Sequence, residues 1–214
     1  MSVAVSFADA ERAYLADALE RLGPDAPTLC EGWTTRDLAI HLVIRERRPD
    51  AGPGMVLPAL SGWTDKVMAG RRHDPYSELV VKIRTGPPVW SPLAVPGVAG
   101  LVNAMEYFVH HEDVRRAQSG WEPRELDSDV EDLIWSRVRR QARVMFRKAP
   151  VGVTLRRADN GAEAVAKAST PVVTVTGQPG ELLLYAFGRR SAARVGLEGD
   201  AGTVARLEAA EVGL

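Results

Sequence analysis

The spacing of apolar residues changes at Pro150, and this change constrains the fold more than any other feature of the sequence. Before Pro150, long segments repeat apolar residues every three or four positions, which is the period of amphipathic helices. After Pro150, short segments alternate apolar and polar residues, as half-buried strands do. The sequence therefore predicts an α+β protein with two domains, a helical domain over residues 1–150 and a small α+β domain over residues 151–214.

Caps and breakers set the expected helix boundaries of the first domain. Thr34, followed three residues later by Asp37, is a capping-box pattern. Gly23-Pro24 ends the segment before it. Long helices that alternate with loops are typical of an antiparallel four-helix bundle. The expected helices span residues 1–22, 34–47, 59–70, 76–84, 96–118 and 127–148.

The C-terminal segments predict a short sheet with two helices. Asp159-Asn160-Gly161 is a favourable hairpin turn between the first two strands. Pro179 opens a helix rich in leucine, because proline is well tolerated in a first helical turn. The expected strands span residues 151–155, 162–166, 172–176 and 194–198, and a last helix spans residues 201–210.

Charge and composition exclude several classes of partner. The 27 basic and 28 acidic residues give a formal net charge of −1, so we expect no binding to nucleic acid or to an anionic membrane. The stretch over residues 85–105 lacks charges but contains four prolines, which argues against a membrane span. Cys30 is the only cysteine, so an intrachain disulfide is excluded and we expect a cytoplasmic protein. We also expect the chain to be either a monomer or a homodimer.

Glu106 and His110 suggest one half of a metal site. They lie four residues apart, so they project from one side of the expected 96–118 helix, among apolar neighbours. Burying a carboxylate and an imidazole there is costly unless they are paired or bind a metal. His41 follows Asp37 by one turn and can point into the same bundle seam. Two nitrogens and one oxygen would leave positions open for water or substrate, as in catalytic zinc sites. Nickel, iron and manganese are alternatives to zinc.

The neighbouring polar residues allow simpler interpretations. Asp113 lies one turn beyond His110 and is expected to orient its imidazole, whereas His111 points about 100° away and is not expected to ligate. No base for Cys30 is evident nearby in the sequence, so we expect it to be a small buried apolar residue. A Glu/His pair at this spacing is also common on exposed helices, so a metal-free scaffold is an alternative.

The other candidate functional residues are better interpreted as structural. Trp33 is expected to pack where the second helix begins, and His73 to be solvated among charged neighbours. Cations at a helix C-terminus interact favourably with the helix dipole, and this explains Arg45, Arg47 and Arg48 better than binding of an acidic substrate does.

The segment from Leu29 to His41, LCEGWTTRDLAIH, resembles the C-x-G-W-T-x-x-D-L-x-x-H signature of the DinB-like bundle family. More narrowly, it is similar to mycothiol-dependent maleylpyruvate isomerases and their actinobacterial relatives, and the predominance of arginine over lysine fits a GC-rich genome of that kind. Residues 106–113 resemble the family's second metal-binding helix, and residues 177–189 its small C-terminal domain.

This resemblance implies a divalent metal, usually zinc, held by His41, Glu106 and His110. It also implies thiol chemistry, with mycothiol as a co-substrate that attacks a small electrophilic substrate. Fold does not fix function, so two hypotheses stay open. The chain is either a metal-dependent, thiol-using isomerase or transferase, or a non-catalytic module of the same fold that binds a metal or a small ligand.

Overall fold

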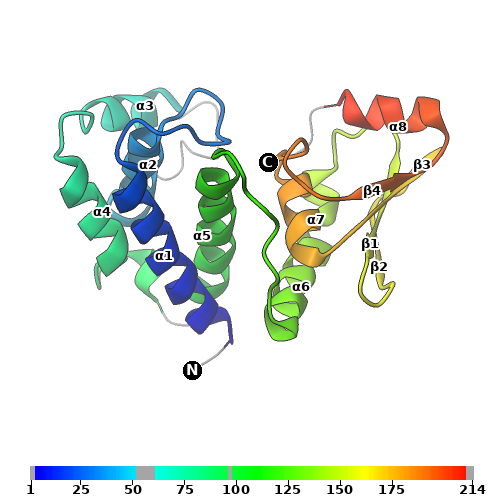
Figure 1. Cartoon of the computed structure of the whole chain (residues 1–214), viewed down its shortest axis with the longest axis horizontal. Coiled ribbons are helices and arrows are strands. Elements are labelled where there is room, and N and C mark those ends of the chain that lie inside the picture. The colour runs from blue at the N-terminus through cyan, green and yellow to red at the C-terminus, as the bar shows by residue number, and fades with distance from the viewer. Residues whose placement is uncertain (1–2, 52–60, 96–97, 211–214) are drawn as a thin grey trace. The chain divides into compact units, whose positions relative to one another are not determined.

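The protein is described here from a computed structural model, which describes residues 3–51, 61–95 and 98–210. The chain divides into two compact units, Met1–Glu122 and Pro123–Leu214 (Figure 1). The first is helical and the second combines helices with a sheet, which confirms the expected α+β class. In the described part of the chain, no helix has both the length and the apolar character that crossing a membrane would require.

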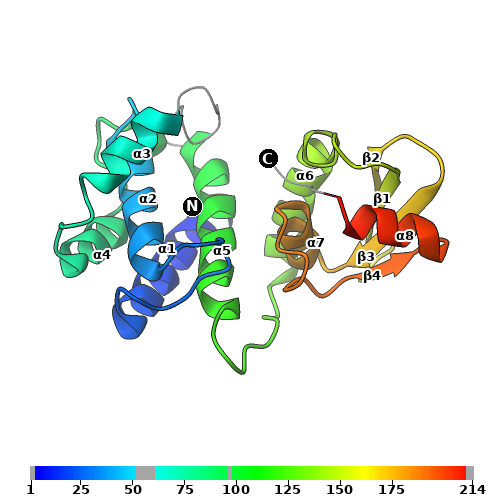
Figure 2. The same ribbon diagram turned by 90° about the horizontal axis from the view of Figure 1, so that it is seen from above.

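The first unit is helical, and its described residues form five α-helices and one short 3-10 helix. α1 contacts α5 and α4, and α2 contacts α4 and α3; Figures 1 and 2 both show α1 and α5 side by side. Leu15, Leu38 and Ile83 are among the fully buried side chains between these helices. The helical elements are α1 (Val3–Leu22), α2 (Thr35–Arg47), α3 (Ser61–Ala69), α4 (Tyr76–Thr85), the short 3-10 helix η3 (Pro92–Ala94) and α5 (Val98–Arg116).

The start of α2 confirms the capping box. The Thr34 side chain accepts a hydrogen bond from the backbone N–H of Asp37, and the Asp37 carboxylate accepts one from the backbone N–H of Thr34 at 3.0 Å. Gly32 just before it has φ +74°, a left-handed conformation that glycine adopts without a steric cost. The turn and the cap together fix where α2 begins, and therefore where His41 lies along it.

The second unit contains a mixed four-stranded sheet in the order β2-β1-β3-β4. β1 pairs antiparallel with β2 across the expected hairpin, and β3 pairs antiparallel with β4. The central pair, β1 and β3, is parallel, with Val153 opposite Val173. Its elements are α6 (Ser128–Met145), β1 (Gly152–Arg157), β2 (Glu163–Lys167), β3 (Val172–Gly177), α7 (Pro179–Ala186), β4 (Gly196–Glu198) and α8 (Ala201–Glu208).

The division of the chain differs from the expected boundary at Pro150. The units separate between Glu122 and Pro123, so α6 belongs to the second unit and not to the bundle. The physical reason is that α6 contacts α7 and β2, where its buried apolar face helps to form the core of the second unit. Periodicity identified α6 as an amphipathic helix but carried no information on which partner covers it.

The helices and strands otherwise begin and end within a few residues of their expected positions. The expected starts at residues 1, 59 and 96 lie outside the described residues, as does the end of the chain after residue 210.

Candidate metal centre

The structure brings His41, Glu106 and His110 together. His41 comes from α2, and the other two lie one turn apart on α5. Oε1 of Glu106 lies 3.3 Å from Nε2 of His41 and 3.3 Å from Nε2 of His110. The three ligand atoms all lie within 4.8 Å of one another. The shared carboxylate oxygen therefore lies between two imidazoles from different helices.

This geometry fits a divalent cation. Tetrahedral nitrogen and oxygen ligands at ~2.0–2.1 Å from zinc lie about 3.3 Å from one another. Both histidine-to-glutamate separations have that value. The His41 and His110 side chains are 13% and 11% exposed and Glu106 is 25% exposed, so the site is sheltered but can still be reached by small molecules.

Arg45 completes the surroundings of the glutamate. Its Nε lies 3.4 Å from Oε1 of Glu106, and its Nη1 donates to Oδ1 of Asn103 at 2.9 Å. The Asn103 amide donates in turn to the carbonyl of Leu93 at 3.1 Å. Arg45 therefore positions Glu106, a role that the sequence did not indicate.

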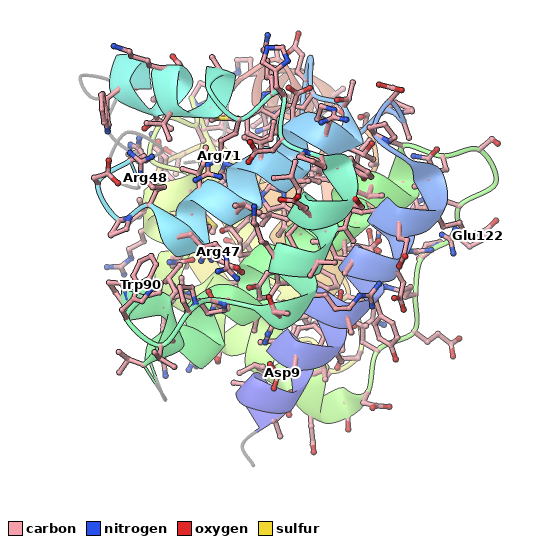
Figure 3. The ribbon with its side chains drawn as sticks, turned by 90° about the vertical axis from the view of Figure 1, so that its left-hand side faces the viewer. Asp9, Arg47, Arg48, Arg71, Trp90 and Glu122 are labelled. Atoms are coloured by element: carbon pink, nitrogen blue, oxygen red, sulfur yellow. The ribbon has the colours of Figure 1, made fainter. Side chains whose placement is uncertain are left out.

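The two arginines that follow contact other partners. Arg47 donates to the carbonyl of Gly86 at 2.9 Å, and Arg48 forms a two-pronged ion pair with Asp50. Figure 3 shows both residues near the C-terminal end of α2. Both arginines therefore have partners within the protein.

The pKa values of the three cluster residues are shifted by burial and by their mutual contacts. Burial alone would raise the pKa of Glu106, but hydrogen bonds from His110 and His41 and the charge of Arg45 hold this pKa well below its usual value. Burial lowers the pKa of His41. Burial would also lower the pKa of His110, but hydrogen bonds to Asp113, Cys30 and Glu106 raise it well above its usual value.

The far side of the His110 ring meets a carboxylate and a thiol. Nδ1 of His110 lies 3.0 Å from Oδ2 of Asp113, which agrees with the expected orienting role of Asp113. The Cys30 thiol donates to the same Oδ2 at 3.2 Å and lies 4.0 Å from Nδ1 of His110. Cys30 is only half-buried and has a carboxylate beside it, which differs from the expected apolar setting. Sequence distance hid this contact, because Cys30 and Asp113 are separated by 83 positions.

The two remaining histidines lie elsewhere. His111 is buried, and its Nδ1 lies 2.9 Å from Oε2 of Glu11 on α1, so it does not face the three-residue cluster. His73 is exposed, as expected.

A pocket of about 410 Å³ lies between α3, α2 and the turn before α2, and none of the three cluster residues lines it. Trp33 lines it and also packs against His41, with 5.2 Å between the ring centroids. The carboxylates of Glu31, Asp37 and Asp65 contribute to the same lining. Trp33 therefore connects the pocket to the cluster, in addition to packing near the start of α2.

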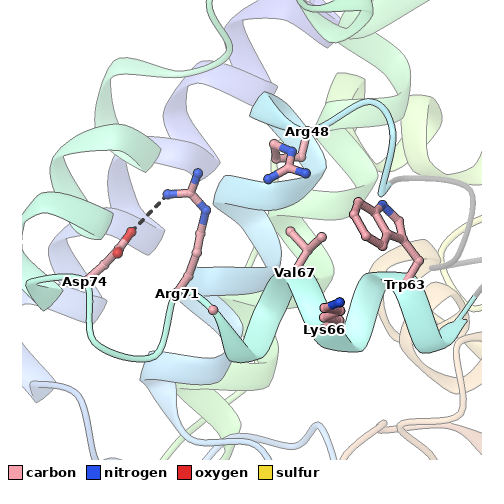
Figure 4. Close-up of a pocket in the computed structure, with 7 residues that line it drawn as sticks. Arg48, Trp63, Lys66, Val67, Arg71 and Asp74 are labelled. Carbon is pink, nitrogen blue, oxygen red and sulfur yellow. Dashed lines mark hydrogen bonds and ion pairs between the residues drawn. The ribbon is translucent and has the colours of Figure 1, made fainter.

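A second pocket, of about 350 Å³, lies along the other side of α3. Its lining includes Trp63, Lys66 and Arg71, and Arg71 is paired with Asp74 at 2.9 Å (Figure 4). It shares no lining residue with the cluster or with the first pocket.

The comparisons with known proteins concern the first unit and the fold. Residues 8–88 match the family model of the mycothiol maleylpyruvate isomerase N-terminal domain. The fold matches a crystal structure of the mycothiol-dependent maleylpyruvate isomerase with a TM-score of 0.61, at 14% identity and over 91% of each chain. A histidine-to-alanine mutant of that enzyme matches with a TM-score of 0.60, at 15% identity and the same coverage.

No curated protein sequence matches the chain significantly. The family model and the fold nevertheless agree with the motif between Leu29 and His41. The family match therefore covers residues 8–88, and the chain as a whole shares the fold of the mycothiol-dependent maleylpyruvate isomerase.

Proposed function

We propose that this protein is a zinc-dependent isomerase or transferase that uses mycothiol, with His41, Glu106 and His110 as the metal ligands. The observation that carries the proposal is the pair of 3.3 Å separations at Oε1 of Glu106, which fit ligands of a common ion. The match to a mycothiol-dependent family supports the thiol. A low-molecular-weight thiol and a single cysteine both fit a cytoplasmic protein.

The residues around the cluster prepare it for this role. When Nδ1 of His110 carries the proton and donates it to Asp113, the lone pair of Nε2 faces Glu106 and His41. Arg45 contacts the same Oε1 of Glu106 and holds the carboxylate in place. A divalent cation bound there would lower the pKa of a thiol and so supply a thiolate at neutral pH.

The pocket beside Trp33 supplies room for the thiol carrier. Its carboxylates from Glu31, Asp37 and Asp65 can accept hydrogen bonds, and its indole offers an apolar face. This combination suits the hydroxyl-rich part of mycothiol. The position of Trp33 against His41 would leave the sulfur end near the metal ligands.

Isomerisation of a small unsaturated acid by this route requires no reagent besides the thiol. Addition of a thiol across a conjugated double bond leaves a single bond that can rotate. Elimination then restores the double bond and releases the thiol unchanged, so no oxidant or reductant is consumed.

The test is an activity measurement on the zinc-loaded protein with mycothiol and maleylpyruvate. The change in the absorbance of the substrate reports the rate. We expect turnover that requires mycothiol and is lost in His41→Ala. Arg140→Ala, on the exposed face of α6, is the matched control and should keep the activity. A protein that binds zinc but shows no thiol-dependent turnover with any small electrophile would contradict the enzyme proposal. It would favour the non-catalytic binding module instead.

A further inference from the structure

We infer that Cys30, Asp113 and Nδ1 of His110 form a second cation site, selective for thiophilic divalent ions, on the opposite side of the His110 ring from the proposed centre. This site goes beyond the proposed function, although the two sites share one imidazole.

The three ligand atoms are already gathered. Sγ of Cys30 lies 3.2 Å from Oδ2 of Asp113, and that oxygen lies 3.0 Å from Nδ1 of His110. The sulfur and the nitrogen are 4.0 Å apart. With zinc–sulfur at ~2.3 Å and zinc–nitrogen at ~2.0–2.1 Å, tetrahedral ligands lie about 3.3–3.6 Å apart. The observed separations lie close to these values, so only small side-chain movements are needed.

The backbone holds the thiol in this position. The N–H of Leu29 donates to the carbonyl of Asp113 at 3.0 Å, which ties the loop to α5. The Thr28 hydroxyl donates to the carbonyl of Trp33 at 2.9 Å and closes the turn around Cys30. The thiol is therefore held against the carboxylate by local and long-range contacts, unlike a cysteine on an untethered loop.

Burial and ligand chemistry indicate which ions would bind. Asp113 is fully buried and Cys30 is half-buried, so an ion can approach from the thiol side and meet a preformed carboxylate behind it. Thiolate and imidazole together favour zinc and softer ions such as cadmium over magnesium, calcium or manganese. The proposed centre has no sulfur, so the two sites differ in selectivity.

The shared ring makes the two sites compete. A neutral imidazole offers one lone pair, because its other nitrogen carries the proton. An ion on Nδ1 requires the proton to move to Nε2, where it points to Glu106. An ion at Cys30 would thus withdraw His110 from the proposed centre, and a thiophilic ion would inhibit that centre by changing the tautomer of one histidine.

Cadmium titration of the full chain tests the site directly. A cadmium–thiolate bond produces an ultraviolet charge-transfer band, and Cys30 is the chain's only cysteine, so the band reports this residue alone. We expect one equivalent of cadmium to produce the band in the wild-type protein. Cys30→Ser should abolish the band. Asp113→Asn should weaken cadmium binding about tenfold or more, as loss of an ordered carboxylate partner does at metal sites.

The matched control is His41→Ala, which removes a ligand of the proposed centre only. It should leave the cadmium band at full strength, so failure of the proposed centre and failure of the Cys30 site give different results. Circular dichroism confirms folding of each variant. As a second measurement that needs no variant, urea unfolding of the wild-type protein should lower its cadmium affinity by disassembling the site. Absence of the band in the folded protein, or equal affinity in the folded and unfolded chains, would overturn the inference.

Discussion

α5 and α6 are helices of similar length that bury very different side chains. The buried face of α6 is almost entirely apolar, whereas α5 buries a series of charged and polar groups next to its apolar ones. The buried residues of α6 are Glu131, Ile134, Trp135, Val138, Ala142 and Met145. The buried polar residues of α5 are Asn103, His110, His111, Glu112, Asp113 and Arg116.

The difference separates a helix that holds a core together from a helix that also positions chemistry. Each buried charge on α5 has a specific partner on another turn or another element. His111 pairs with Glu11 of α1, and Glu112 pairs with Arg116 at 2.5 Å. Burying such groups costs free energy that apolar groups would not. Their concentration on one helix therefore suggests that these groups have a function. The cluster that contains His110 is a candidate for that function.

The largest effect is expected from breaking the buried charges of α5. Glu112→Ala removes the buried carboxylate that contacts both Arg115 and Arg116. We expect the free energy of unfolding of the first unit to fall by about 3–5 kcal/mol. Chemical denaturation measures it. A loss below ~1 kcal/mol, typical of exposed ion pairs, would show that this pair does not behave as a buried one.

The matching change on α6 is Ile134→Ala, at a fully buried position. Deleting these methyl groups leaves a cavity and should cost about 2–5 kcal/mol of unfolding free energy. Zinc affinity should not change, because the cluster lies in the other unit. Denaturation followed together with zinc titration separates the two effects. A large change in zinc affinity would break the distinction between the two helices.

A smaller effect is expected from Asp113→Asn, which keeps the shape of the side chain but removes the charge that orients His110. Zinc affinity at the proposed centre should fall about 10–100-fold, as it does when such a partner of a ligating histidine is lost. Competition with a chelating dye measures it. Asp132→Asn on α6, a carboxylate that contacts Arg157, is the control and should leave the affinity unchanged.

The smallest effect is a dependence of stability on pH that arises at Glu46. Burial raises its pKa above the ordinary value of 4.5, although a hydrogen bond from Tyr107 and the charge of Arg12 act in the opposite direction. The folded protein then holds a proton that the unfolded chain releases. Glu46 therefore contributes less to stability as pH rises from 4.5 through the folded pKa.

Glu46→Gln removes this titration, so the variant should gain stability relative to the wild-type protein over that pH range. Denaturation at several pH values gives the difference. A difference that does not change with pH would contradict the assigned pKa direction.

The sequence predicted much of the fold because local signals were strong. Thr34 and Asp37 marked the start of α2, and the hairpin at Asp159-Asn160-Gly161 marked the β1–β2 pair. It did not predict the parallel pairing of β1 with β3 or the unit to which α6 belongs. Both depend on contacts between distant segments, and periodicity describes only which face of an element is buried.

The candidate site shows the same limit. Helical spacing placed Glu106 and His110 on one side of α5, and the position of His41 one turn after Asp37, together with the motif that ends there, suggested the third member. The roles of Arg45 and Cys30 were not predictable from spacing. Arg45 on α2 reaches Glu106 on α5, and Cys30 reaches Asp113 next to the point where the N–H of Leu29 donates to the Asp113 carbonyl.

Zinc content per chain is the most direct test of the central claim, that two helices gather His41, Glu106 and His110 around one cation. Protein dialysed against limiting zinc and analysed by atomic emission should hold close to one zinc per chain. His41→Ala, checked for folding by circular dichroism, should hold far less under the same conditions. Equal zinc in the two proteins, or none in the wild-type protein, would contradict the account.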